Sequence, residues 1–259
     1  MVFFYFSNLK IKEFLSRPIQ SFFYFYSNQL TTLMKIHFAI ALFFSMSIYS
    51  QVSNETKAAY NLYDEIIGLE NTALSYGKYY SEKYRTLDNN HQYFVKNDFV
   101  KGNVTYQNKT FYNVYLKYNT SEDLLIVINK NQIALENALV SNFELYEKDF
   151  INSETLGYLE VIYKNEQFIF FKKNKKNKRK KLNESFVYYK FLDKNTYYLK
   201  IDVNYYEVEN KKDVINHFPE LKKLIINTYK TNKKLYRTNT DSFYKLLGNV
   251  ISKHIKNKI

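Results

Sequence analysis

Residues 104–128, VTYQNKTFYNVYLKYNTSEDLLIVI, contain the pattern from which the fold is predicted. Two apolar segments, 104–106 and 111–118, flank the turn sequence Gln107-Asn108-Lys109, which is typical of an antiparallel hairpin. Tyr112, Val114, Leu116 and Tyr118 fall on one face of the second strand, and Asn113 and Lys117 fall on the other. Residues 124–128 are continuously apolar, as expected of a strand covered on both faces. We therefore expect a half-buried hairpin followed by a fully buried strand.

The hairpin pattern recurs toward the C-terminus. Residues 158–163 and 167–171 flank the turn Lys164-Asn165-Glu166, and residues 186–192 and 196–203 flank Asp193-Lys194-Asn195. Residues 205–208 are expected to pair again. Residues 133–146 fit a helix loosely and also fit a strand, and we interpret them as strand. Successive hairpins of this kind predict a curved antiparallel sheet with one dry face.

Helical periodicity occurs near residues 55–67 and again in residues 210–259. Residues 55–67 carry apolar side chains at helical spacing, with Asn54 as a candidate N-cap and Gly68 as the terminating residue. Residues 210–259 predict two to three helices, in which Asn210 and Asp213 resemble a capping box, Pro219 suits a first helical position and Thr240 is a candidate cap. The predicted class is α+β: a curved antiparallel β-sheet built of hairpins, with an N-terminal helix and a C-terminal helical segment.

Residues 34–50 resemble a cleavable signal peptide. Lys35 precedes an uncharged apolar run that the small residue Ser50 closes, so cleavage is expected before Gln51. The run is shorter than the roughly twenty residues that a membrane-spanning helix needs, which favours a signal over an anchor. Residues 1–33 are interpreted as a spurious extension from a start codon assigned too early, and a genuine N-terminal membrane segment is the alternative.

The mature protein is expected to contain a mainly antiparallel β domain, residues 51–209, and a basic helical segment, residues 210–259, packed on it. The sequence contains no cysteine, which excludes disulfides, thiol catalysis and the lipid anchor of a lipoprotein. We therefore expect an exported protein of the periplasm, the outer membrane or the extracellular space.

Positive charge is the second conspicuous property of the chain. The formal net charge is +13, and the densest cluster is the run KKNKKNKRKK at residues 172–181, predicted as a loop between strands. Its cations are the candidate contacts to an anionic partner: Lys172, Lys173, Lys175, Lys176, Lys178, Arg179, Lys180 and Lys181. Such a run is typical of a surface that binds an acidic protein or an anionic envelope surface, and also of a solvated loop without a binding role.

The sequence contains no recognisable catalytic, metal-binding or nucleotide-binding motif. The five glycines are scattered, so there is no Gly-rich phosphate loop, and His91, His217 and His254 show no metal-ligand spacing. The acidic pairs Asp64-Glu65 and Glu122-Asp123 are better explained as solvated side chains than as acid–base catalysts. We therefore predict no catalytic residue, no metal ligand and no cofactor, and we disfavour an enzyme.

Several short motifs between residues 90 and 126 match a shared pattern. They are Asn90-His91-Gln92-Tyr93-Phe94, Phe99-Val100-Lys101-Gly102, Val104-Thr105-Tyr106, residues 112–118 and residues 123–126. On these motifs, and on the order of a Lys-rich loop, a Tyr-rich hairpin and a Lys-rich helix pair downstream, the chain resembles a family of uncharacterised secreted proteins of Gram-negative bacteria. Asn119 and Asn90 depart from the family pattern, which usually has Asp and Gly there. The resemblance implies location and architecture and brings no known activity.

Four function classes remain open, of which a hydrolase of envelope polymers is the weakest. The favoured one is a non-enzymatic secreted or envelope protein that binds or scaffolds a partner. Alternating strands and 27 tyrosines also suit an outer-membrane β-barrel, although the basic helical end argues against it. A basic nucleic-acid-binding protein is the third class, and it requires the signal-peptide interpretation to be wrong.

The signal-peptide interpretation predicts the N-terminus of the native protein. We expect the chain in the envelope fraction to begin at Gln51, because the signal is removed during export. Mass spectrometry of N-terminal peptides from separated cell fractions measures this directly. A cytoplasmic chain that begins at Met1 or Met34 would contradict export and make nucleic-acid binding the leading hypothesis.

Overall fold

The computed structural model describes residues 56–87, 89–183 and 185–256. The chain divides into two units, Met1–Ala59 and Tyr60–Ile259, and the sheet and the C-terminal helices belong to the second. The predicted signal peptide, the extension before it and the candidate cap Asn54 lie outside the described residues. Within the part of the chain that is described, no helix is both long and apolar enough to cross a membrane.

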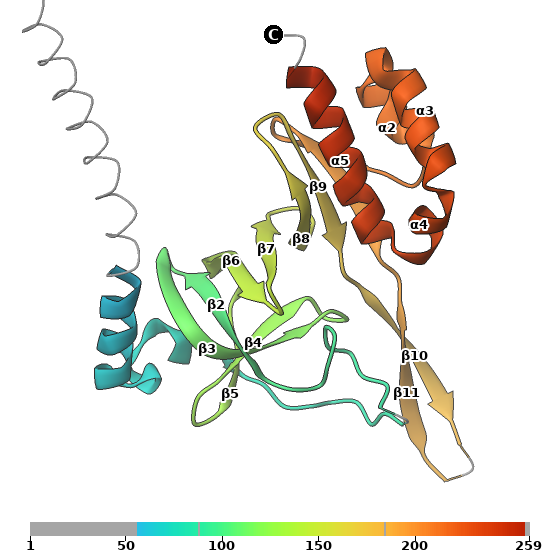
Figure 1. Cartoon of the computed structure of the whole chain (residues 1–259). Helices are drawn as coiled ribbons and strands as arrows, with labels where there is room; N and C mark the ends of the chain where they lie inside the picture. Colours follow the sequence, from blue (N-terminus) through green and yellow to red (C-terminus); the bar gives the residue numbers. More distant parts are fainter. Residues whose placement is uncertain (1–55, 88, 184, 257–259) are drawn as a thin grey trace, which may run out of the picture. The chain divides into compact units, whose positions relative to one another are not determined.

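The fold is α+β, as predicted, and most strands belong to a single antiparallel sheet (Figure 1). The strands of this sheet are β1 (Lys78–Tyr79), β2 (Val100–Tyr106), β3 (Lys109–Asn119), β4 (Leu124–Ile128), β5 (Gln132–Ala134), β6 (Val140–Leu145), β7 (Lys148–Ser153), β8 (Gly157–Lys164), β9 (Phe168–Lys173), β12 (Thr196–Ile201) and β13 (Asn204–Glu207). Their order across the sheet is β1-β5-β4-β3-β2-β6-β7-β8-β9-β12-β13, so β1 and β13 are its open edges. The remaining described strands, β10 (Lys176–Leu182) and β11 (Val187–Asp193), form a separate two-stranded sheet.

The sheet is curved, as predicted. Asp123 lies in the turn between β3 and β4, yet its carboxylate accepts a hydrogen bond of 2.6 Å from Lys173 at the end of β9. In the sheet, β2, β6, β7 and β8 separate β3 from β9. Neighbouring strands lie about 4.8 Å apart, so a flat sheet would hold β3 and β9 more than about 20 Å apart. The contact therefore requires the sheet to curl until these strands approach each other.

The predicted first hairpin is confirmed, with one correction to its faces. β2 and β3 pair antiparallel, but the register shifts between Gly102 and Val104. Opposite this shift, Asn113 has a φ of +55°, and its amide donates to the side chain of Asn103 at 3.1 Å. This bulge turns the strand, so that Phe111 is buried in place of the expected Tyr112.

The later hairpins are confirmed in part. β8 pairs with β9 and β12 pairs with β13, as predicted. The predicted pairing of residues 186–192 with 196–203 is wrong, because β11 pairs with β10 while β12 pairs with β9. Residues 133–146, interpreted as strand, contain the end of β5, a short 3-10 turn (Asn137–Leu139) and the whole of β6.

An aromatic core fills one part of the curled sheet. Tyr118 lies at its centre, with its ring 5.5 Å from that of Phe143, 5.6 Å from Phe150 and 5.7 Å from Tyr158. These rings come from β3, β6, β7 and β8, so their contacts join strands that are not all neighbours. Edge-to-face aromatic pairs contribute about 0.5–1.5 kcal/mol each beyond the area that they bury.

The second core lies between the sheet and the C-terminal helices. The helices are α2 (Lys211–His217), a 3-10 turn (Pro219–Leu221), α3 (Lys222–Thr231), α4 (Lys233–Thr238) and α5 (Thr240–Lys256). Phe168 and Phe170 of β9 and Leu199 of β12 pack in one buried cluster with Phe243 and Leu247 of α5. Helix α1 (residues 56–67) and two 3-10 turns (Leu69–Asn71 and Ala73–Ser75) precede β1.

The helix starts follow local capping chemistry. The predicted capping box is present: Asn210 accepts from the amide of Lys212, and Asp213 accepts from the amide of Asn210. The predicted Thr240 cap is wrong, because the side chain of Asn239 accepts from the amide of Ser242 at 3.0 Å. The hydroxyl of Thr240 instead donates to the carbonyl of Tyr236 in the preceding helix.

The contact of α5 with β8 depends on a missing side chain. A Cβ atom at Gly248 would overlap the ring of Tyr163, whose Cε1 atom would lie 2.9 Å away. On an exposed helix, Gly→Ala stabilises by about 1 kcal/mol. We expect Gly248→Ala to destabilise this protein by about 1–3 kcal/mol in urea unfolding, because the added methyl group overpacks the contact.

The matched background for this prediction is Tyr163→Ala, which removes the ring. In that background Gly248→Ala should become neutral or stabilising. An equal loss of stability in both backgrounds would show that the ring does not account for the glycine.

Candidate functional site

The basic run is not a loop, in contrast to the prediction. Lys172 and Lys173 end β9, and residues 176–181 form most of β10 (Figure 1). β10 pairs with β11 throughout, from Lys176 opposite Asp193 to Leu182 opposite Val187. We call this two-stranded unit, residues 176–182 and 187–193, the basic ribbon.

Lys172 and Lys173 lie on opposite faces of β9, because successive side chains of a strand alternate. Lys173 donates to Asp123 at 2.6 Å, while Lys172 donates to Asp241 of α5 at 2.8 Å. The side chain of Lys172 is only 12% exposed and that of Lys173 only 15%. These two candidate contacts are therefore occupied by internal carboxylates.

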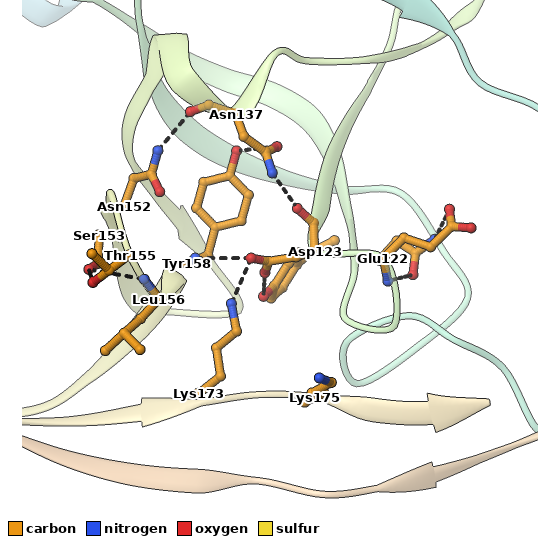
Figure 2. Close-up of polar contacts among 12 residues, drawn as sticks. Glu122, Asp123, Asn137, Asn152, Ser153, Thr155, Leu156, Tyr158, Lys173 and Lys175 are labelled. Carbon is orange, nitrogen blue, oxygen red and sulfur yellow. Dashed lines mark hydrogen bonds and ion pairs between the residues drawn. The ribbon is translucent and has the colours of Figure 1, made fainter. Parts of the chain in front are cut away.

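Asp123 is the centre of a polar network (Figure 2). One carboxylate oxygen accepts from the hydroxyl of Tyr118 at 2.6 Å, and the other accepts from Lys173 and from the amide of Tyr158. Burial, followed by the charge of Asp123, raises the pKa of Tyr118 well above its ordinary value. The phenol therefore stays protonated and remains a hydrogen-bond donor to the carboxylate.

Asn137 extends the network to β7 and β8. Its side chain donates to the carbonyl of Asp123 at 2.8 Å and accepts from the hydroxyl of Tyr158 at 3.0 Å. Asn152 donates to the carbonyl of Asn137 at 2.7 Å, as Figure 2 also shows. At Gly157, which has a φ of +69°, any Cβ atom would collide with the Asp123 carboxylate. The glycine thus allows the close approach of backbone and carboxylate.

A second set of ion pairs joins the sheet to α5. Asp241 accepts from Lys172 and, at 2.6 Å, from the hydroxyl of Tyr197. Lys148 lies 4.0 Å from Asp241 and forms an ion pair with Glu160, which is only 2% exposed. Asn174 donates to the other oxygen of Glu160 at 2.7 Å. Each carboxylate here has partners from two elements, so the arrangement is that of a structural clamp.

Lys176 and Lys178 anchor the ribbon at its base. Lys176 donates to the backbone carbonyls of His91 and Tyr93 at 3.0 and 2.8 Å. Lys178 donates to the hydroxyl of Tyr84 at 2.8 Å and lies 3.9 Å from the centre of its ring. The hydrogen bond to Tyr84 is the main cause that raises the pKa of Lys178.

The segment before β2 completes this anchor. The side chain of Asn90 accepts from the amide of Phe191 at 2.6 Å and donates to its carbonyl at 2.9 Å. Tyr84 packs edge-on against Tyr189 and Phe191 of β11. An isolated two-stranded hairpin is only marginally stable, so these contacts hold the ribbon in place.

The remaining cations face solvent. Lys175, Arg179, Lys180 and Lys181 are exposed, and no side-chain partner is found for them within the described residues. In the ribbon, Arg179 lies opposite Lys190 and Lys181 lies opposite Tyr188. The side chains of Arg179, Lys181, Tyr188 and Lys190 therefore share one face. Lys178 and Lys180 belong to the other face, opposite Phe191 and Tyr189. We call Arg179, Lys181, Lys190 and Tyr188 the basic face.

Two members of the basic face, Lys190 and Tyr188, were not among the predicted contacts, and Lys190 is the cation of the two. It lies outside the run, within a strand that was expected to pair with residues 196–203. The signal that locates it is the pairing of residues 176–182 with 187–193 about a short connection. A run of lysines does not show strand periodicity, so this pairing was not evident in the sequence.

The other candidate groups have structural partners. His91 accepts from the amide of Tyr93, and burial and the nearby Lys176 lower its pKa. His217 stacks on Tyr206 with ring centres 4.1 Å apart. Asp64 pairs with Lys109 at 2.8 Å. No group of three or more acidic, histidine or cysteine residues that could hold a metal ion is found in the described residues.

Comparisons with known proteins identify no relative of this chain: no family model, no curated protein and no solved structure matches it. The site is therefore interpreted from its own geometry.

The clamp at α5 predicts a specific acid sensitivity. Burial alone would raise the pKa of Asp241, but hydrogen bonds from Lys172 and Tyr197 outweigh burial and lower it. A carboxyl with a lowered pKa in the folded state stabilises the protein above the ordinary pKa of about 4, and this contribution is lost as pH falls through the lower, folded-state pKa. We expect Asp241→Asn to cost about 1–3 kcal/mol at neutral pH.

Urea unfolding at a series of pH values measures this effect. The difference between the parent protein and Asp241→Asn should begin to shrink below about pH 4, where Asp241 of the unfolded parent becomes protonated, and should vanish as the pH falls through the lower pKa of the folded state. Glu166→Gln, in the exposed turn between β8 and β9, changes the net charge equally and serves as the control. A difference that does not depend on pH would contradict the role of the ionised carboxylate.

Proposed function

We propose that this chain is a non-enzymatic exported protein that binds an anionic surface of the cell envelope through the basic face of its ribbon. The observation that carries the proposal is the division of the basic run. Lys172, Lys173 and Lys176 are partly covered and donate to groups within the protein, and Lys178 is exposed but donates to Tyr84. Arg179 and Lys181, by contrast, join Lys190 on one exposed face.

The spacing of the cations favours an extended anionic surface as the partner. Alternate residues of a strand lie about 6.5–7 Å apart on the same face. Arg179 and Lys181 therefore form a short row, and Lys190 lies across from Arg179 on the neighbouring strand. A row of separated cations on a ribbon suits anions that repeat along a surface, as lipid headgroups do.

Tyr188 adds an amphipathic side chain to the same face. It pairs with Lys181, and its ring also contacts that of Phe186 at 6.3 Å. Tyrosine combines an apolar ring with a hydroxyl group, and it is enriched where one end of a side chain is apolar and the other is wet. The combination of tyrosine with Lys and Arg is typical of contacts at a membrane–water interface.

Other features support binding over catalysis and export over a cytoplasmic role. The carboxylates of Asp123, Glu160 and Asp241 all accept hydrogen bonds from partners on two or more elements, an arrangement that holds the fold together. The export part of the proposal rests on the signal-like pattern of residues 34–50.

The proposal predicts binding to vesicles that contain anionic lipid. The test compares co-sedimentation of the purified protein with phosphatidylglycerol-containing and pure phosphatidylcholine vesicles. Each Lys or Arg near an anionic membrane contributes about 1 kcal/mol. The combined variant Arg179→Gln, Lys181→Gln, Lys190→Gln should therefore lose about 100-fold in affinity for the anionic vesicles.

A second combined variant, Lys211→Gln, Lys223→Gln, Lys234→Gln, is the matched control. It removes the same charge from exposed positions of α2, α3 and α4. Equal losses in both variants would show attraction by net charge alone and would contradict the ribbon as the contact surface. Binding to duplex DNA without binding to vesicles would favour the nucleic-acid alternative.

A further inference from the structure

Lys117 is a buried lysine at a position where the strand pattern predicts a solvated one. It lies on β3, and its side chain is only 6% exposed. Its amine lies 4.3 Å from the ring centre of Tyr93 and 4.6 Å from that of Phe99. The two rings remove most of the water that would otherwise solvate the ammonium group.

Two polar groups reach the amine of Lys117. The amine donates a hydrogen bond to Oδ1 of Asn97 at 3.0 Å, and it lies 3.6 Å from Oε1 of Glu82. Burial lowers the pKa of Lys117, although Glu82 and Asp98 oppose this effect. A lower pKa increases the fraction of neutral amine, and the neutral amine is the nucleophilic form.

Glu82 is positioned by the same aromatic cluster. Its Oε1 atom accepts from the hydroxyl of Tyr93 at 3.0 Å, and that hydroxyl lies 3.1 Å from the hydroxyl of Tyr80. The carboxylate is therefore directed toward Lys117 by a residue whose ring also covers the amine. An amine, a carboxamide and a carboxylate thus converge at the edge of the core, where the amine is buried while Asn97 is exposed and the side chain of Glu82 is 46% exposed.

We propose that Lys117 and Asn97 form an intramolecular isopeptide bond, with Glu82 as the proton-transfer group. The Nζ atom of Lys117 attacks Cγ of Asn97, and Glu82 accepts a proton from the attacking nitrogen. Glu82 then delivers this proton to the departing nitrogen of the carboxamide. The new N–C bond replaces the original C–N bond, and one molecule of ammonia leaves. No oxidant or external reactant is needed.

The ion pair of Lys173 and Asp123 provides a contrast that explains why Lys117 is the candidate. Lys173 faces an ionised carboxylate that already accepts from Tyr118, so the pair is stable as an ion pair. Asn97 offers Lys117 an uncharged carboxamide, whose leaving group can accept a proton from Glu82. The product would tie the segment before β2 to β3 in a chain that has no cysteine for a disulfide.

Mass spectrometry of the purified full chain tests the proposal. The intact mass should fall below the mass expected from the sequence by one ammonia. Trypsin should fail to cleave after Lys117, and a branched peptide that joins residues 97 and 117 should be found. A full sequence mass in folded protein would overturn the proposal.

Three substitutions sharpen the test. Glu82→Gln should restore the full mass, because the proton-transfer group is lost, whereas Glu122→Gln, which changes a carboxylate bonded to Tyr84, should keep the cross-link. Asn97→Asp should lose water in place of ammonia and reach the same final mass as the parent. A parent-like loss of ammonia in Glu82→Gln would overturn the role of Glu82.

Succinimide formation at the Asn97–Asp98 bond also releases ammonia, and Lys117→Arg separates the two reactions. This substitution keeps the positive charge but removes the primary amine. Restoration of the full mass supports the isopeptide bond. If Lys117→Arg still lacks one ammonia, the product is a succinimide and the proposal is wrong.

Discussion

The interaction on which the rest of the structure depends is the one around the carboxylate of Asp123. It lies in the turn between β3 and β4, but its donors include Lys173 of β9 and the amide of Tyr158 in β8. Four strands separate β3 from β9 in the sheet, so these bonds form only when the sheet curls. The curl in turn brings the rings of Tyr118, Phe143 and Phe150 together. Near this core the carboxylate of Asp123 is stabilised by hydrogen bonds from Tyr118, Tyr158 and Lys173. These three donors come from three different strands.

Local patterns in the sequence predicted the local parts of this fold. The β2–β3 and β8–β9 hairpins, and the capping box at Asn210, each depend on residues close together in the chain, and all three are confirmed. The predictions that are wrong concern segments whose structure is determined by a non-local contact or by an irregular backbone. The bulge at Asn113 buries Phe111 in place of the expected Tyr112. The lysine-rich segment shows no apolar alternation, yet it is a strand because β10 pairs with β11. Neither effect can be predicted from an alternation of apolar and polar residues, because that pattern applies only to regular strands.

The candidate site illustrates the same limit. The basic run was treated as one surface because its members are adjacent in sequence, yet the structure gives them different roles. The partners of Lys172 and Lys173 lie 69 and 50 residues away, respectively, and no local pattern connects them. Conversely, Lys190 joins the basic face from outside the run because the ribbon places it opposite Arg179. Charge density predicted where cations gather, but the pairing of the strands decides which of them share a face.

The ribbon also has a consequence for self-association. Among the described residues, β10 has a neighbouring strand on one side only. The amide of Lys176 donates to the carbonyl of Thr120 at 3.4 Å, but beyond it the other edge of β10 faces no strand and is open to an extended chain that approaches. That edge is bordered by Lys180, Lys181 and Arg179, and a second copy of the same strand would bring like charges together. Lysine-rich edges are a means by which β proteins discourage strand-to-strand aggregation. The charges of this run would therefore oppose polymerisation of the chain through the exposed edge of β10.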